Sequence, residues 1–186
     1  NEELLPEDVE AVAQKIRESD FMLVQLEIPV STVLSAVKIA AEAGVKVILN
    51  PAPMTDLPEE LFRMLYAITP NKTEAEALTG ITVHNQEDAL RAAQMLVGKG
   101  VENVIVTMGK SGSLICSRGS SRFVPALKVN AVDTTAAGDV YNGALVTALA
   151  EGRTVEEAAG FATRASAVAV TRMGAQTSAP YRKEIK

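Results

Sequence analysis

Residues 21–50 read FMLVQLEIPVSTVLSAVKIAAEAGVKVILN, and this stretch decides the fold. Its first four residues form a continuous apolar run, which is typical of a strand buried on both faces. Apolar residues then recur at helical spacing from Val30 to Ala41, and Gly44 ends that helix. A second apolar run, residues 45–49, follows at once. The order strand, helix, strand predicts two parallel strands joined by a helical crossover.

The same alternation continues along the rest of the chain. It predicts helices over 6–19, 59–65, from 73, over 89–97, from 137 and from 154, and strands over 67–68 and 104–106. Two strand-like runs, 113–116 and 122–125, are joined by Arg118-Gly119-Ser120-Ser121 and predict a hairpin. We therefore expect one α/β domain over residues 1–186. Its sheet should be mostly parallel, with helices on both faces and a small β-hairpin.

Composition excludes several classes of protein. The 186 residues are 47% hydrophobic and 22% charged, which is ordinary for a globular chain. A net charge of -5 and the lack of a long apolar run argue against nucleic-acid and membrane partners. One cysteine and one histidine exclude an internal disulfide and a Cys/His zinc cluster, so we expect a cytoplasmic protein. The first residue is not Met, so we expect either a processed start or a piece of a longer protein.

The most informative motif is VDTTAAGD, residues 132–139, between an expected strand and an expected helix. Small residues at a helix start let backbone N–H groups approach a ligand, and these groups favour an anion. Asp139 places a carboxylate beside that anion site, where it can accept a proton from an attacking group. The alternative is a helix start at which Asp139 only complements the helix dipole.

Four motifs occur in an order that resembles the PfkB family of sugar kinases, and within it the ribokinases. They are LNPAP at 49–53, TPNKTEAE at 69–76, DTTAAGD at 133–139 and TRMGAQ at 171–176. The resemblance runs over almost the whole chain and implies a ribokinase-like fold. It matches the C-terminal three-fifths of such an enzyme, without the N-terminal part that holds the sugar and forms a lid.

The resemblance also implies roles for single residues. Asp139 is the expected general base and contacts the sugar, while Ala136, Ala137 and Gly138 form the expected anion hole. Glu27 is an expected sugar contact, although it could equally be a solvated strand end.

Nucleotide contacts follow from the same resemblance. The expected ATP-binding residues are Asn71, Glu74, Thr107, Met108, Gly109, Lys110, Ser111, Gly112, Gly138, Asp139 and Thr163. Asn71 and Glu74 would act on the phosphates and on Mg²⁺ through water, but the same pair also fits a capping box. Thr163 stands where many relatives carry Asn or His, which puts its adenine contact in doubt.

A site for a monovalent cation, K⁺, is implied as well. Its expected ligands are Asp133, Thr135, Ala169, Arg172, Gly174 and Ser178. For Asp133 and Ser178, ordinary turn chemistry is the alternative.

The implied activity is ATP-dependent phosphorylation of a sugar hydroxyl, with D-ribose giving ribose 5-phosphate. Alternatives are a related kinase acting on fructose, a phosphosugar or a nucleoside, and a non-catalytic nucleotide-binding or structural fragment. We expect the parent protein to be a homodimer. The chain alone should self-associate and be inactive, because it lacks the lid and most sugar contacts.

Overall fold

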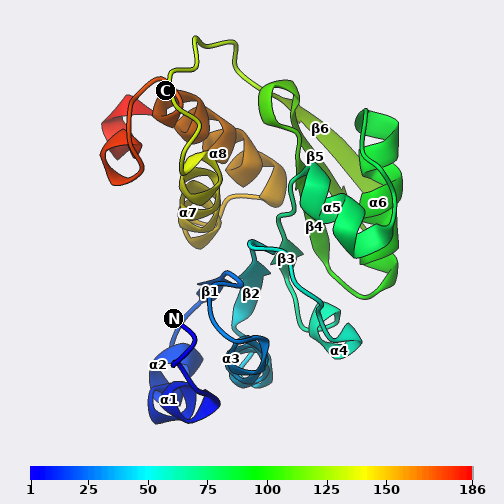
Figure 1. Ribbon diagram of the computed structural model, residues 1–186, viewed down its shortest axis with the longest axis vertical. Helices are drawn as coiled ribbons and strands as arrows, with labels where there is room; N and C mark the ends of the chain where they lie inside the picture. The colour runs from blue at the N-terminus through cyan, green and yellow to red at the C-terminus, as the bar shows by residue number, and fades with distance from the viewer. Residues whose placement is uncertain (186) are drawn as a thin grey trace. The chain divides into compact units, whose positions relative to one another are not determined.

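A computed structural model describes residues 1–185 and contains one six-stranded sheet (Figure 1). The strand order is β1-β2-β3-β4-β5-β6. The strands are β1 (Phe21–Val24), β2 (Lys46–Leu49), β3 (Ala67–Ile68), β4 (Asn103–Thr107), β5 (Gly112–Ser117) and β6 (Ser120–Pro125). The chain divides into two compact units, and each is described by itself below. That residues 1–186 form a single domain stays a prediction.

The first unit comprises residues 1–107 and 114–121 and contains the parallel part of the sheet. Met22 pairs with Val47, Ile48 with Ala67, and Ile68 with Val104. The predicted alternation of strands and helices is confirmed. Apolar side chains of β2, β3 and β4 are fully buried, which explains their continuous apolar runs. β1 lies at the edge of the sheet, and its Leu23 is 39% exposed.

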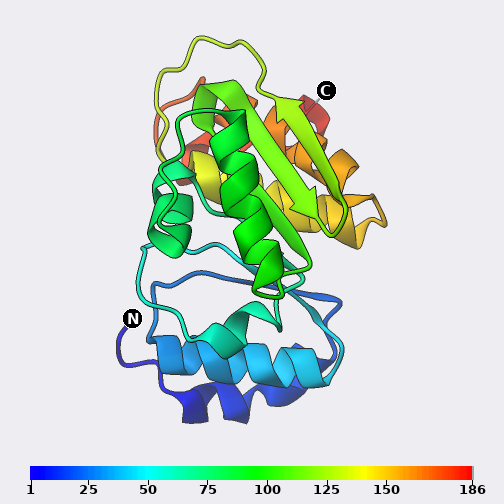
Figure 2. The ribbon, with the colours of Figure 1, turned by 90° about the vertical axis from the view of Figure 1, so that its right-hand side faces the viewer.

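The helices of this unit lie on one face of its strands (Figures 1 and 2). They are α1 (Pro6–Ala11), α2 (Ala13–Arg17), α3 (Val30–Glu42), α4 (Glu59–Phe62), α5 (Lys72–Thr79) and α6 (Gln86–Gly98). Two predicted helices differ from the structure. The helix expected over 6–19 is broken at Val12, whose N–H bonds to the carbonyl of Val9 three residues back. The helix expected over 59–65 ends at Phe62 for the same reason, because Leu65 N–H bonds to Phe62.

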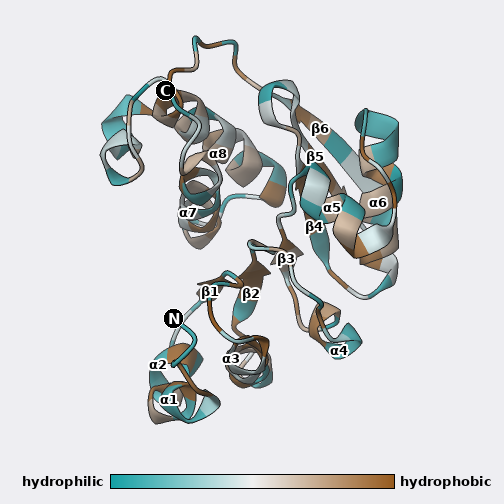
Figure 3. Cartoon of the chain, in the orientation of Figure 1, coloured by the Kyte–Doolittle hydropathy of each residue, from teal (hydrophilic) through white to brown (hydrophobic). Residues whose placement is uncertain are grey.

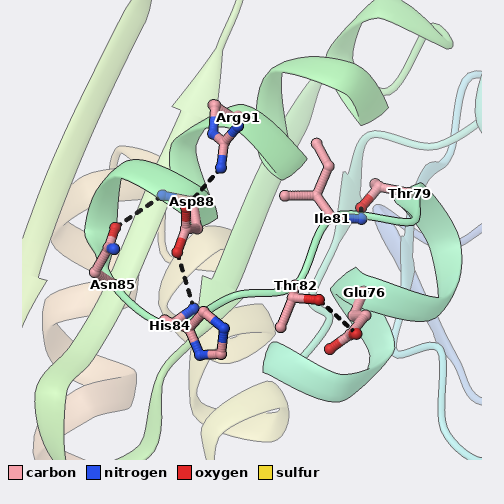
Figure 4. Close-up of polar contacts among 8 residues, drawn as sticks. All are labelled: Glu76, Thr79, Ile81, Thr82, His84, Asn85, Asp88 and Arg91. Carbon is pink, nitrogen blue, oxygen red and sulfur yellow. Dashed lines mark hydrogen bonds and ion pairs between the residues drawn. The ribbon is translucent and has the colours of Figure 1, made fainter.

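The connection between α5 and α6 is ordered by local polar contacts (Figure 4). Asn85 caps α6 by accepting a hydrogen bond from Asp88 N at 3.0 Å. The carboxylate of Asp88 accepts from His84 N at 3.1 Å and from Arg91 at 2.7 Å. The single histidine is therefore part of a helix start. The apolar and polar sides of α6 are visible in Figure 3, with Ala89, Ala92, Ala93 and Leu96 buried.

The second unit comprises residues 108–113 and the chain from Arg122 onward. Its helices are α7 (Ala137–Ala150), α8 (Val155–Ala169) and the short 3₁₀ turns η1 (Gly109–Ser111), η2 (Gln176–Ser178) and η3 (Arg182–Glu184). α7 and α8 pack side by side through small buried residues such as Ala148 and Ala162 (Figure 1). The helix predicted from 154 is confirmed as α8, and a capping box starts it, since Thr154 and Glu157 bond reciprocally at 2.9 and 3.2 Å.

The C-terminal segment of this unit is fastened around Phe161. The guanidinium groups of Arg153 and Arg182 lie 4.7 Å from the ring centroid, and that of Arg164 lies 6.0 Å away. Arg182 also forms a bidentate ion pair with Glu151 at the end of α7. Cation–π contacts and the ion pair thus connect η3 to both long helices.

No helix in residues 1–185 is long and apolar enough to cross a bilayer.

Candidate active site

The first turn of α7 has an unusual backbone. Ala136, its N-cap residue, has φ 58° and ψ 11°, and it is the one non-glycine residue with positive φ among residues 1–185. Its side chain makes no capping hydrogen bond. A non-glycine residue in the left-handed region costs about 1 kcal/mol or more, and such residues cluster at ligand sites. The turn has no side-chain cap, and an uncapped helix start of this kind can meet an anion through backbone N–H groups.

Hydrogen bonds from outside the turn hold this shape. Ser166 of α8 donates to the carbonyl of Ala137 at 3.1 Å, and the Asn142 amide donates to the carbonyl of Gly138 at 3.0 Å. Ala137 N–H donates to Thr134 at 3.2 Å, so this predicted anion-hole donor already has an acceptor. The sequence did not single out Ser166 and Asn142. In the sequence, these two residues stand out only as polar residues within helices that are rich in alanine.

Asp139 occupies the same turn and borders open space. It lines a cavity of about 530 Å³ within the second unit. Other walls of this cavity are small residues of α7, among them Val140, Gly143 and Ala144, while Gln176 and Arg182 line it from the C-terminal segment. The four predicted catalytic residues are therefore consecutive on one helix start, with the carboxylate accessible.

The loop before α7 is tied to the loop after α8 through Asp133. One carboxylate oxygen accepts from Thr135 N at 2.9 Å, and the other accepts from Gly174 N at 2.9 Å. Hydrogen bonds from Thr135 and then from Gly174 lower the pKa of Asp133. Gly174 has φ +89°, and a Cβ there would lie 2.6 Å from Thr177 Oγ1. The structure thus brings together three of the predicted cation ligands.

The other predicted cation ligands are engaged as follows. The Arg172 guanidinium pairs with Glu184 at 2.6 Å, so only its backbone oxygen is available as a ligand. Ser178 is buried and donates to Ala175 at 2.8 Å, and the Ala169 carbonyl accepts from Arg172 N at 3.0 Å. Carbonyl and carboxylate oxygens keep further lone pairs after one hydrogen bond. The donor set is therefore compatible with K⁺, although cation binding stays a prediction.

In the first unit, predicted site residues gather at the carboxyl ends of the parallel strands. Glu27 follows β1, Asn71 follows β3, and Thr107 ends β4. Asn71 and Thr107 form a parallel bridge, and Thr107 N donates to Pro70 at 2.9 Å. Ligands of open α/β sheets bind at the carboxyl ends of the parallel strands.

Asn71 and Glu74 form a closed capping box at the start of α5. Asn71 Oδ1 accepts from Glu74 N at 2.9 Å, while the Glu74 carboxylate accepts from Asn71 N at 2.8 Å and from its Nδ2 at 2.6 Å. Burial raises the pKa of Glu74, and the hydrogen bond from the Asn71 backbone opposes this shift. The capping alternative drawn from the sequence is confirmed. A phosphate or Mg²⁺ role for the same pair stays a prediction.

The predicted nucleotide turn, residues 107–112, is closed by backbone hydrogen bonds. Met108 N donates to Gly112 at 2.8 Å, and Ser111 N donates to Met108 at 3.2 Å. Gly112 has φ +122°, and a Cβ there would lie 2.1 Å from the carbonyl oxygen of Val124. Only glycine fits this position. Lys110 and Ser111 are exposed on the turn.

Thr163 lies on α8 and uses its hydroxyl internally. The hydroxyl donates to the Ala159 carbonyl at 2.8 Å. An adenine contact at Thr163 stays a prediction. Within residues 1–185 no group of three or more His, Cys, Asp or Glu residues could hold a metal ion. The predicted Mg²⁺ contact would therefore depend on Asn71, Glu74, water and phosphate.

Comparison with known proteins gives the context for this geometry. A family model described as pfkB family carbohydrate kinase matches residues 1–182. A ribokinase of Haemophilus influenzae is 47% identical over 170 residues, covering 91% of this chain and 56% of that protein. A deoxyribokinase of Salmonella typhi is 38% identical over 181 residues, covering 97% of this chain and 59% of that protein.

A solved structure of Arabidopsis thaliana ribokinase, complexed with ribose and ATP, superposes with a TM-score of 0.90 at 33% identity. It covers 95% of this chain and 57% of that one. The chain thus spans less than two thirds of the length of the relatives it matches. The α/β fold with its mostly parallel six-stranded sheet is ribokinase-like. By its sequence and its fold, the chain belongs to the PfkB family of carbohydrate kinases.

Proposed function

We propose that the protein containing this chain transfers the γ-phosphoryl group of ATP to a hydroxyl of D-ribose, giving ribose 5-phosphate and ADP. The observation that carries the proposal is the uncapped first turn of α7, with Ala136 in the left-handed region and Asp139 three residues later. Ribokinase relatives such as that of Haemophilus influenzae support the choice of sugar.

In the proposed mechanism Asp139 accepts the proton of the attacking hydroxyl. The sugar oxygen then forms a bond to the γ-phosphorus, and the bond from that phosphorus to the ADP oxygen breaks. Backbone N–H groups of the first turn of α7, together with its positive dipole end, stabilise the negative charge that develops on the transferring group. The strained, externally braced turn keeps these donors in place before the nucleotide arrives.

Asn71, Glu74, the turn 107–112 and Thr163 are the proposed nucleotide contacts. Mg²⁺ would be held between the phosphates and the Asn71–Glu74 pair through water, where it would neutralise phosphate charge. The half-buried carboxylate of Glu74 has a raised pKa, and a nearby cation would favour its charged form.

We propose K⁺ as an activator held at the loops of Asp133 and Ser178. Its role would be to order the loop that enters α7. Exchange of K⁺ for a bulky organic cation at constant ionic strength should lower kcat while the circular dichroism spectrum stays unchanged. Equal rates in the two salts would remove the site from the proposal.

The acceptor is tested on the full-length protein with a coupled assay over D-ribose, 2-deoxyribose, fructose, a phosphosugar and a nucleoside. We expect the highest kcat/KM with D-ribose. Deoxyribose is the second candidate, because the Salmonella typhi relative is a deoxyribokinase. Glu27 would contact the sugar, so Glu27→Gln should raise KM for the sugar more than KM for ATP. No sugar-dependent ADP formation with any acceptor would refute the kinase proposal.

For the chain by itself we propose ATP-Mg binding without sugar phosphorylation above background, together with self-association through the edge strand β1. Leu23 of that strand is 39% exposed, and a bare apolar edge favours pairing. We further propose a homodimeric parent in the cytoplasm. Calorimetry with ATP, product analysis with ribose and sedimentation at two concentrations test these points separately.

A further inference from the structure

Tyr141 carries a buried hydroxyl two residues after the proposed base. It lies in the first part of α7 and is 6% exposed. Its hydroxyl donates to Ser113 Oγ at 3.1 Å, and Ser113 is itself only 1% exposed. Ser113 directly follows Gly112, the last residue of the proposed nucleotide turn 107–112. One hydrogen bond therefore connects the helix of Asp139 to the proposed nucleotide turn, within the second unit.

Burial also keeps this hydroxyl protonated, because it raises the pKa of Tyr141 to about 12. The group is therefore a neutral phenol near neutral pH and keeps the proton that it donates to Ser113.

The hydroxyl of Tyr141 contributes a hydrogen bond, while the ring alone accounts for the apolar packing. A phenylalanine ring would fill the same apolar space, but it would leave Ser113 Oγ buried without that donor. Hydrogen bonds in a buried setting fix relative position more sharply than packing alone. Ser166 and Asn142 donate to backbone carbonyl groups of this turn, while Tyr141 bonds to a side chain, that of Ser113.

We propose that Tyr141 is a positioning residue: its hydroxyl, bonded to Ser113, fixes the start of α7 and thereby the carboxylate of Asp139. The catalytic part of this inference rests on the proposed function. The structural part does not, and it can be tested on the chain without any substrate.

The first experiment measures amide hydrogen exchange of residues 140–144 in Tyr141→Phe and in the unchanged chain. We expect exchange to quicken at least about threefold, because the substituted helix start opens more often. Tyr181→Phe is the matched control, since it also removes a tyrosine hydroxyl but at a side chain that is 76% exposed. Unchanged exchange in Tyr141→Phe would overturn the structural part. If Tyr141→Phe does not fold, Ser113→Ala removes the same hydrogen bond and keeps the phenol.

The second experiment measures kinetics of the full-length protein well below its melting temperature. Tyr141→Phe should lower kcat about tenfold and change KM for ATP less than twofold, because a small displacement of a catalytic group mainly slows the chemical step. The double variant Tyr141→Phe/Ser113→Ala should be no slower than either single variant, since both remove one bond. Additive losses, or an unchanged kcat in Tyr141→Phe, would overturn the positioning role.

Asp139→Asn measured alongside separates the two levels of inference. Full activity in Asp139→Asn would refute the assigned base and leave the exchange result to decide whether Tyr141 holds the turn. Loss of activity in Asp139→Asn with unchanged kcat in Tyr141→Phe would refute only the role of Tyr141.

Discussion

The helix starts of α5 and α7 are both predicted to meet phosphate, yet they are built in opposite ways. At α5, Asn71 and Glu74 satisfy each other's backbone and side-chain groups in a closed capping box. At α7, Ala136 gives no side-chain cap and has a left-handed backbone, while Ser166 and Asn142 support the turn from outside. The first start is capped by its own residues. The second has no side-chain cap, and we propose that its backbone donors meet a ligand.

This difference suggests how catalysis and stability are divided between the two helices. A side-chain cap uses the N–H groups that an anion would need, so a closed start binds phosphate less directly. An open start costs stability but is preorganised for negative charge. Substitutions at α7 should therefore affect mainly rate, and substitutions at α5 mainly stability.

The largest effect is expected at the open start. In the full-length protein Asp139→Asn should lower kcat by about 10²–10⁴ and leave ATP affinity nearly unchanged, since that is the usual contribution of a general base. Glu156→Gln is a matched control, because it removes a first-turn carboxylate from α8 at an exposed position. Steady-state kinetics decide the point, and wild-type kcat in Asp139→Asn would refute the contrast.

The closed start is tested by Asn71→Ala, which should lower the free energy of unfolding by about 1 kcal/mol through loss of the cap. Asn85→Ala provides the control, because Asn85 caps α6 in the same way, with its side chain accepting from Asp88 N at 3.0 Å. Urea denaturation should give similar losses for both. If Asn71 also contacts nucleotide, only Asn71→Ala should raise KM for ATP. An unchanged KM for ATP would show that Asn71 only caps α5 and does not contact the nucleotide.

The strain at Ala136 gives a smaller effect of opposite sign. Ala136→Gly should raise the free energy of unfolding by about 0.5–1 kcal/mol, because glycine adopts a left-handed backbone without the steric cost of a Cβ. Ala144→Gly in the middle of α7 should instead lower it by about 1 kcal/mol. Thermal and urea denaturation measure both. A loss of stability in Ala136→Gly would show that the turn is not strained.

The smallest expected effect is the contribution of Asp133 to stability at acidic pH. The pKa of Asp133 is lowered by hydrogen bonds from Thr135 and Gly174, so its folded pKa lies below the ordinary 3.8. A carboxylate of this kind stabilises the fold fully above about pH 4 and loses that contribution as pH falls through the lowered pKa. Asp133→Asn should therefore lower the urea midpoint near neutral pH and flatten its decline toward pH 3. Equal slopes for both proteins would contradict this.

Much of the fold could be predicted from sequence because its strands and helices have regular apolar patterns. The runs at 21–24 and 45–49, the spacing in α6 and the capping box at Thr154 all indicate local structure that does not depend on distant contacts. The failures have local causes too. The sequence around Val12 and Leu65 has helical spacing. The backbone N–H of each residue bonds to the carbonyl three residues back, and the helix ends there.

The site was harder to predict from local signals. VDTTAAGD indicates a helix start, but the left-handed backbone of Ala136 and its supports come from tertiary contacts. Ser166 lies 29 residues from the carbonyl it holds, and Tyr141 lies 28 residues from Ser113. No spacing rule connects such pairs. The distance in sequence between partners explains why the motif was visible and its bracing was not.

The arginines around Phe161 give the C-terminal segment a sensitivity to ionic strength. Arg182, Arg153 and Glu151 are partly exposed charges, so counterions weaken their attraction over a Debye length of about 8 Å in physiological salt. The contact between guanidinium planes and the aromatic ring depends less on screening. In concentrated salt the segment should still contact Phe161, but it should exchange more rapidly with a state in which Arg182 has left the ring. Proteolysis at Lys183 should then become faster. Its rate would therefore report how much the Arg182–Glu151 ion pair holds residues 182–185 in place.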